Sequence, residues 1–170
     1  EVIGKTVKAV LQNQNYPKDK LKVYVCAHNC KDRTATEAEK AGAKVYVLND
    51  PDPDHGRVSY PLRYRRQQIL KEDKDTEFFI RIDADNFLHP DFVRQRNNSI
   101  SGGAKIVRAY EAASNLKQNI WTETCALFYT KDSRLQNTFR QAVHSTSRTP
   151  GPGLTFTREV AEKRNGWDSM

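Results

Sequence analysis

Apolar residues recur along the chain with two different periods, which predict alternating helices and strands. An amphipathic helix that ends near NQNYP is predicted by four apolar residues at helical spacing: Ile3, Val7, Val10 and Leu11. Residues 21–27 and 43–48 are runs rich in β-branched and aromatic residues, which favour strands. Between them, Thr34 and Glu37 fit a capping box at the start of a helix, and Gly42 fits its C-terminal stop.

The remainder of the chain continues this alternation. Residues 60–72 predict a second long helix, and the run EFFIRID at 77–83 predicts a third strand. The later elements are a short helix from Pro90, a strand at 105–110, a long helix between Ile120 and Val143, a Gly/Pro-rich turn at 149–153, and a last strand and helix at 154–164. Trp121 and Phe128 fit one face of the long helix, and we expect that face to be buried.

This order of elements predicts a single α/β domain with a Rossmann-like, mostly parallel central sheet flanked by helices. Right-handed crossovers would connect its strands, and ligands of such sheets bind beyond the carboxyl ends of the strands. Asp83 and Asp85 follow the third predicted strand at such an end. We therefore expect the ligand site around these two carboxylates.

The spacing Asp-x-Asp occurs four times, so its context decides which pair is of interest. Only Asp83 and Asp85 follow a run with a strand pattern. We interpret the acids of the other pairs as solvated charge on loops and helix ends: Asp50, Asp52, Asp54, Asp73 and Asp75.

Composition narrows the range of functions. The chain has 170 residues, 37% apolar and 29% charged, which is typical of one soluble domain, and no apolar run approaches the roughly 18 residues of a membrane span. The net charge of +7 suits an anionic partner such as a nucleotide, a nucleic acid or an anionic membrane surface. Cys26, Cys30 and Cys125 match no zinc or CxxC spacing, so we expect reduced thiols in a cytosolic setting.

The acidic pair at Asp83 and Asp85 has two interpretations. Two carboxylates at i and i+2 around a tight turn can face one hard cation, and Mg²⁺ or Mn²⁺ held there would bridge a diphosphate and neutralise charge on a leaving phosphate. Alternatively, Asp83 ends the strand and Asp85 caps the helix entered at Pro90, with no ligand at all. Spacing and strand context leave both interpretations open.

Three separated motifs resemble those of one enzyme family, in the family's order. They lie at residues 7–47, at 81–92 (RIDADNFLHPDF) and at 151–168 (GPGLTFTREVAEKRNGWD). Together they look like the family 2 inverting glycosyltransferases, which have a GT-A fold, over nearly the whole chain. The resemblance implies a nucleotide-binding half at 1–85 and an acceptor and donor-sugar half at 86–170.

In that family an acidic pair at the end of a strand binds a metal ion and the diphosphate of a nucleotide sugar. By matching, the resemblance implies that Asp85 binds Mn²⁺ or Mg²⁺ and that Asp83 lies near the ribose or the water shell of the metal. The family's nucleobase loop corresponds to HNCKD, with His28, Asn29 and Asp32, although His28 stands where the family often has an aspartate. Arg57 is expected to replace a usual lysine that this chain lacks.

The family's Gly-x-Gly and Gly-Trp-Asp elements match Gly151, Gly153, Trp167 and Asp168, which are thereby implied to line the donor sugar and acceptor side. Trp167 either stacks on a sugar ring or packs in the core. The family fold opens with a strand that precedes the first helix here, and its general base follows Gly-Trp-Asp. We therefore expect that the first strand and a C-terminal part are missing, that the base lies beyond Met170, and that the isolated chain is inactive.

The resemblance implies transfer of a sugar from a nucleotide donor to an acceptor hydroxyl with inversion. We expect a uridine diphosphate sugar as donor and a polysaccharide or lipid-linked acceptor, in cell-surface polysaccharide or glycolipid synthesis. The expected location is the cytoplasm or the cytoplasmic face of a membrane, with membrane association through segments outside these residues.

Two other functions compete with this assignment. A haloacid-dehalogenase-type phosphatase would use Asp83 and Asp85 as nucleophile and general acid, but that family has threonine or valine where Phe87 stands. A basic nucleic-acid-binding module would explain the net charge of +7, but the basic residues are scattered and form no recognisable motif.

Overall fold

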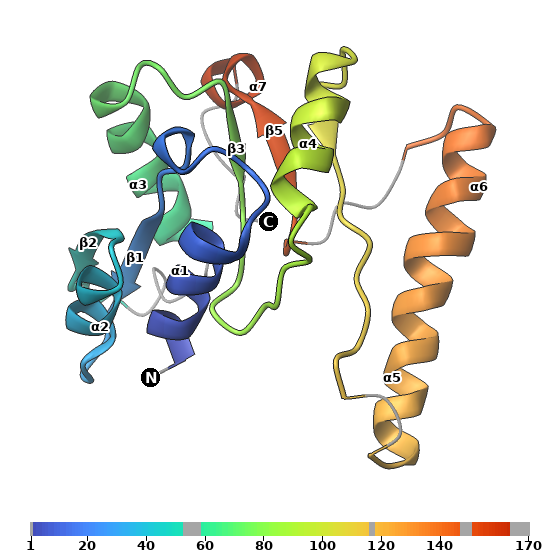
Figure 1. Cartoon of the computed structure of the whole chain (residues 1–170), viewed down its shortest axis with the longest axis horizontal. Coiled ribbons are helices and arrows are strands. Elements are labelled where there is room, and N and C mark those ends of the chain that lie inside the picture. Colours follow the sequence, from blue (N-terminus) through green and yellow to red (C-terminus); the bar gives the residue numbers. More distant parts are fainter. Residues whose placement is uncertain (1, 53–58, 116–117, 147–150, 164–170) are drawn as a thin grey trace.

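The computed structural model of the chain describes residues 2–52, 59–115, 118–146 and 151–163 (Figure 1). The helices are α1 (Val2–Asn13), α2 (Thr34–Lys40), α3 (Ser59–Glu72), α4 (Phe92–Ser101), α5 (Ile120–Thr130), α6 (Asn137–Ala142) and α7 (Arg158–Lys163). The strands are β1 (Tyr24–His28), β2 (Lys44–Leu48), β3 (Phe78–Ile80), β4 (Ile106–Val107) and β5 (Thr155–Thr157). A 3₁₀ turn lies at Lys18–Lys20, and a π-helical segment at Lys131–Gln136 joins α5 to α6.

The alternating helices and strands confirm the predicted α/β class. Each helix lies close to the position that the apolar period predicted, but the strands are shorter than predicted. In particular, β3 ends at Ile80 and β4 contains only Ile106–Val107. A strand ends where its backbone stops pairing with a neighbouring strand. The local sequence pattern does not show that neighbour, so it does not fix where the strand ends.

The start of α2 differs from the predicted capping box. Arg33 is the N-cap residue, and its side chain makes no capping hydrogen bond. Thr34 is already the first helical residue, and its backbone N–H donates to Oδ1 of Asp32 over 3.1 Å. At the other end, Gly42 has a φ of +101° and terminates the helix as predicted.

β1 and β2 form the parallel pair that the chain order predicted, with Tyr24 opposite Lys44 and His28 opposite Leu48. Side chains alternate across the pair. Val25 and Val45 pack with α1 and α2 in a cluster around Val7, Ala38 and Ala43. On the other face, the guanidinium of Arg65 from α3 lies 5.2 Å from the ring centroid of Tyr46. The β1–β2 pair is thus covered by α1 and α2 on one face and by α3 on the other.

The third strand does not join this parallel pair, which corrects the prediction of one mostly parallel sheet. Instead, β3 and β4 both pair with β5 in an antiparallel sheet of order β3-β5-β4. Although β1 and β3 do not pair, residues of both strands, including Val25 and Phe79, line one cavity of about 1020 Å³. The crossover rule assumes that successive strands share a sheet, whereas β3 pairs with a segment more than seventy residues further along the chain.

Two apolar clusters hold the antiparallel sheet in place. One centres on Phe92, Val93 and Ala109, with Phe78 and Ile80 packed against it. The other is formed by Leu154, Phe156 and Ala161, together with Leu70, Phe79 and Val160. The rings of Phe79 and Phe156 stack with their centroids 5.8 Å apart. These contacts fix β3, and therefore the loop that follows it, relative to α3, α4 and α7.

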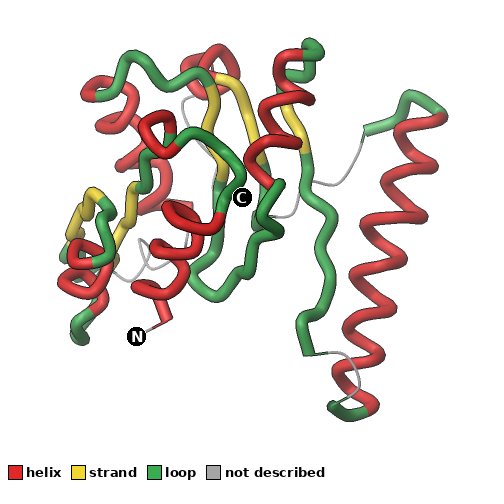
Figure 2. Tube along the Cα trace, in the orientation of Figure 1, coloured by secondary structure: helices red, strands yellow, loops and turns green. Residues whose placement is uncertain are grey.

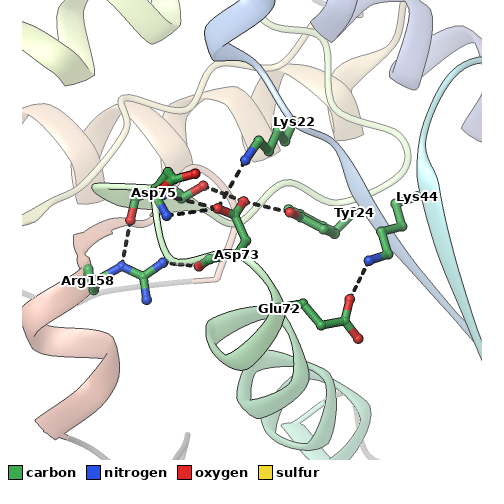
Figure 3. Close-up of polar contacts among 8 residues, drawn as sticks. Lys22, Tyr24, Lys44, Glu72, Asp73, Asp75 and Arg158 are labelled. Carbon is green, nitrogen blue, oxygen red and sulfur yellow. Dashed lines mark hydrogen bonds and ion pairs between the residues drawn. The ribbon is translucent and has the colours of Figure 1, made fainter.

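A buried polar cluster at the end of α3 corrects a second prediction, because Asp73 is only 5% exposed (Figure 3). Its carboxylate accepts hydrogen bonds from Tyr24 over 2.7 Å and from Thr76 over 2.6 Å, and it pairs with Lys22 at 3.1 Å. Arg158 of α7 donates to the carbonyl oxygens of Thr76 and Asp73. The cluster therefore joins α3, β1 and α7. The sequence does not reveal this role, because locally Asp73 is only an acid at the end of a helix.

The long helix predicted between Ile120 and Val143 is present, and it stands beside the rest of the molecule (Figure 2). We call residues 119–143 the arm. Asn119 caps its start through a capping box with Thr122. Trp121 and Phe128, which were expected to be buried, are 77% and 60% exposed. A helical period shows that one face is apolar, but it does not show whether another segment covers that face.

Candidate functional site

Asp83 and Asp85 lie on a tight turn that begins three residues beyond the end of β3. The backbone N–H of Asn86 donates to the carbonyl of Asp83 over 3.1 Å, and Oδ1 of Asn86 accepts from the backbone N–H of Asp83 over 3.0 Å. Asp85 is exposed, and the side chain of Asp83 is 43% exposed. The N-cap residue of α4 is Asp91. Asp85 therefore does not cap that helix, and the alternative interpretation of the acidic pair is wrong on this point.

Helix α1 holds this turn from one side. The hydroxyl of Thr6 donates a hydrogen bond to the carbonyl oxygen of Ala84, the residue between the two acids. In Figure 1, β1 and β3 both run toward the lower side of the body, so the loops after both strands lie on that side. The predicted donor-binding loop and the acidic turn thus share one side of the molecule. Sequence reasoning missed Thr6, which carries no local signal of this long-range contact.

Arg81 links the acidic turn to the glycine motif. One of its guanidinium nitrogens lies 3.3 Å from Oδ1 of Asp83. The backbone of Arg81 donates to Leu154 over 2.9 Å and accepts from Gly153 over 2.7 Å. A Cβ atom on Gly151 would lie 2.2 Å from Nη1 of Arg81, so a larger residue there would displace the guanidinium. The structure therefore brings Asp83, Gly151 and Gly153 together, although Arg81 itself was not singled out from sequence.

Gly153 brings a further segment to the same place. Its φ is +68°, which favours glycine, and an added Cβ would lie 2.2 Å from Cβ of Ala109. Glu111 follows two residues later. Its Oε1 is buried and has no hydrogen-bond partner among the described residues. Burial raises the pKa of Glu111, Arg108 opposes this effect, and the nearby carboxylates of Asp132 and Asp83 raise the pKa further.

Arg108 and Asp132, which both affect the pKa of Glu111, form a polar cluster with it. Their side chains are each 12% exposed and form an ion pair of 2.6 Å between the segment after β4 and the π-helical segment of the arm. π-helical turns occur often at functional sites. Sequence reasoning missed both residues and Glu111. The available signal was that Glu111 directly follows a predicted strand, as Asp83 and Asp85 do.

The residues expected to hold the nucleobase lie at the carboxyl end of β1. Asn29 has a φ of +51°, and its side chain both donates to and accepts from the backbone of Asp50 over 2.8 Å. It therefore clamps the loops after β1 and β2 together. Hydrogen bonds from Thr34 lower the pKa of the exposed Asp32. By contrast, Nε2 of His28 is buried and has no hydrogen-bond partner among the described residues.

Three of the expected site residues, Arg57, Trp167 and Asp168, lie outside the described residues. Within the described part of the chain, no group of three or more His, Cys, Asp and Glu side chains is arranged to hold a metal ion. Mg²⁺ needs fewer protein ligands than that, because it retains waters and binds through one or two carboxylates together with substrate phosphates. The exposed turn of Asp83 and Asp85 fits a metal ion that binds together with a diphosphate.

Comparison with known proteins gives one positive result. The family model described as "Glycosyltransferase like family 2" matches residues 1–170. No curated protein and no solved structure matches the chain significantly. Among the described residues, no helix combines the length and the apolar character needed to cross a membrane.

Proposed function

The chain belongs to glycosyltransferase-like family 2, and from this premise we propose that it transfers a sugar from a nucleotide diphosphate donor to an acceptor hydroxyl with the help of a divalent metal ion. Family membership itself supports a glycosyltransferase that uses a nucleotide-sugar donor and an acceptor. Domains of this family commonly use divalent metals. The specific donor, the metal and the residue roles below are part of the proposal.

The observation that carries the proposal is the connection between the acidic turn and the glycine motif through Arg81. The exposed Asp85 would bind Mn²⁺ or Mg²⁺, and Asp83 would contact the ribose or the water shell of the metal. A metal ion bound there neutralises charge on the departing diphosphate. Gly151 and Gly153 would act through the backbone on the donor-sugar side, by allowing Arg81 to lie beside this turn.

Donor recognition is proposed to involve the loop after β1. His28, the last residue of β1, would contact the nucleotide from the start of this loop. Asn29 and Asp32 would act by shaping the loop, since both use their side chains within it. Arg57 would add positive charge near the diphosphate.

The reaction would be a single displacement at the anomeric carbon. The acceptor oxygen forms a bond to this carbon as the bond to the diphosphate breaks, and the diphosphate leaves with the bonding electrons. A carboxylate base takes the proton of the acceptor hydroxyl. Trp167 and Asp168 are proposed on the acceptor side. We further propose a uridine diphosphate donor and a polysaccharide or lipid-linked acceptor used at the cytoplasmic face of a membrane.

Calorimetric titration with uridine diphosphate, in the presence and absence of Mn²⁺, tests this proposal. Asp85→Asn should weaken metal-dependent nucleotide binding by more than about tenfold. Asp75→Asn is the matched control, because Asp75 is also exposed, belongs to another Asp-x-Asp pair and carries the same charge. Equal nucleotide affinity with and without metal in all three proteins would refute the metal role. A nucleotide-sugar screen by thermal shift would then identify the donor.

A further inference from the structure

The arm has its apolar residues on the outside. Seven large apolar side chains between residues 120 and 143 are each more than half exposed: Ile120, Trp121, Leu127, Phe128, Leu135, Phe139 and Val143. Such a concentration of exposed apolar side chains on one helical segment is unusual on a protein that has no partner. We therefore expect another molecule to cover this surface.

The side of the arm that is buried is small or polar. Ala126, Asp132 and Asn137 are the buried residues of the arm. At about 100° per residue, Ala126 lies on the opposite side of α5 from Trp121 and Phe128. Asp132 is buried through its ion pair with Arg108. The rest of the chain thus meets the polar side, and the apolar side is left for something else.

A second copy of the arm is not the occupant that this pattern favours. Trp121, Phe128 and Leu135 are seven residues apart, as in the first seam position of a coiled coil. The second seam position would then fall on residues 124, 131 and 138, which are threonine, lysine and threonine. The π-helical segment also shifts the register within the arm. A broad apolar face with polar residues at alternate seam positions does not form such a coiled coil.

Charge and composition favour a lipid surface. Lys131 is exposed on the arm, and Arg134 is exposed with its guanidinium beside Tyr110 of the body. Glu123 is the exposed acid of the arm, and Asp132 pairs with Arg108. The whole chain carries a net charge of +7. Helices that lie in a membrane interface combine Trp, Phe and Leu on one face with basic residues beside it, and they bind anionic lipids best.

We propose that the arm docks on an anionic lipid surface, with its apolar face at the boundary between headgroups and acyl chains. The arm lies in this surface and does not cross it. This proposal does not depend on sugar transfer, because it rests on the exposed face of the arm alone. It predicts that the described residues themselves bind lipid, without any membrane segment elsewhere.

Vesicle flotation tests the proposal with the purified protein. The protein should float with phosphatidylcholine vesicles that contain about 30% phosphatidylglycerol, and much less with phosphatidylcholine alone. In a Trp167→Phe background, the emission of Trp121 should shift to shorter wavelength on binding and should be quenched by brominated lipid. Failure to bind the anionic vesicles, or binding without a change in Trp121 emission, would overturn the proposal.

Two double variants separate apolar insertion from general charge attraction. Phe128→Glu with Leu135→Glu should reduce vesicle binding at least tenfold more than Gln118→Glu with Gln141→Glu. Both variants change the net charge equally and alter only exposed positions, and circular dichroism would verify their folding. Equal losses in both variants would overturn the proposal. A dimer in sedimentation analysis that disappears only in the first variant would assign the surface to a second copy instead.

Discussion

At the residue scale, the candidate site depends on the close approach at Gly153 and on the place of Arg81 beside Gly151. Gly153 lies against Ala109 and also donates its backbone N–H to Arg81, which in turn contacts Asp83. Gly151 makes room for the guanidinium of the same arginine. The glycine motif therefore shapes the acidic turn through Arg81 even before any ligand binds.

Gly153→Ala should destabilise the protein for two reasons, a positive φ and a steric clash. Gly103 provides the control, because its φ is +94° but nothing lies within 4 Å of an added Cβ. Gly103→Ala should cost about 1 kcal/mol, from the backbone conformation alone. Gly153→Ala should cost about 1–3 kcal/mol more, from overpacking against Ala109. Urea unfolding measures both free energies, and equal costs would contradict the close approach.

At the element scale, the Asp73 cluster joins three elements through one buried carboxylate. Burial alone would raise the pKa of Asp73, but hydrogen bonds from Thr76 and Tyr24 and the ammonium of Lys22 outweigh it and hold the pKa well below its usual range. Burial and the hydrogen bond to Asp73 raise the pKa of Tyr24. Near neutral pH the carboxylate is therefore ionised and the phenol is neutral, which is the state that the cluster requires.

Asp73→Asn should lower the free energy of unfolding by about 2–3 kcal/mol near neutral pH, because hydrogen bonds to a charged group are lost. Tyr24→Phe removes a single donor and should cost about 1 kcal/mol. The folded-state pKa of Asp73 is lowered, so its stabilisation is complete above the unfolded pKa of about 3.9 and is lost as the pH falls below that value. Denaturation at several pH values would measure this. A difference between wild type and Asp73→Asn that did not shrink in acid would contradict the assignment.

At the scale of the whole molecule, the arm and the body are joined by few contacts. The ion pair between Arg108 and Asp132 is one, and the guanidinium of Arg134, 5.1 Å from the ring centroid of Tyr110, is another. The body in turn is built around a parallel and an antiparallel sheet, with apolar clusters associated with each. We therefore expect the arm to open locally while the body stays folded.

Arg108→Gln should loosen the arm, because it removes the ion pair with the mostly buried carboxylate of Asp132. Amide hydrogen exchange across residues 120–143 should become at least about tenfold faster, with little change in α1, β1 and β2. Lys105→Gln is the control, since its ion pair with Glu159 is exposed and worth little. If both variants gave the same exchange in the arm, the ion pair would not be what holds it.

The sequence by itself determined which segments become helices and strands, because the apolar period reflects the repeat of the local backbone. It thereby predicted the α/β class, the parallel pairing of β1 with β2 and the position of Asp83 and Asp85 after a strand. Resemblance to a family added Gly151 and Gly153, and the family match over residues 1–170 confirms that resemblance.

Only the tertiary structure decided which distant segments meet. The pairing of β3 with β5, the burial of Asp73 and the exposure of Trp121 each depend on segments far away in the chain. The same holds for Arg81, which contacts the glycine motif, and for Glu111, which lies two residues after the Ala109 that packs against Gly153. Local periods specify the backbone of one segment, whereas burial and pairing are properties of two segments together, so no single stretch of sequence contains them.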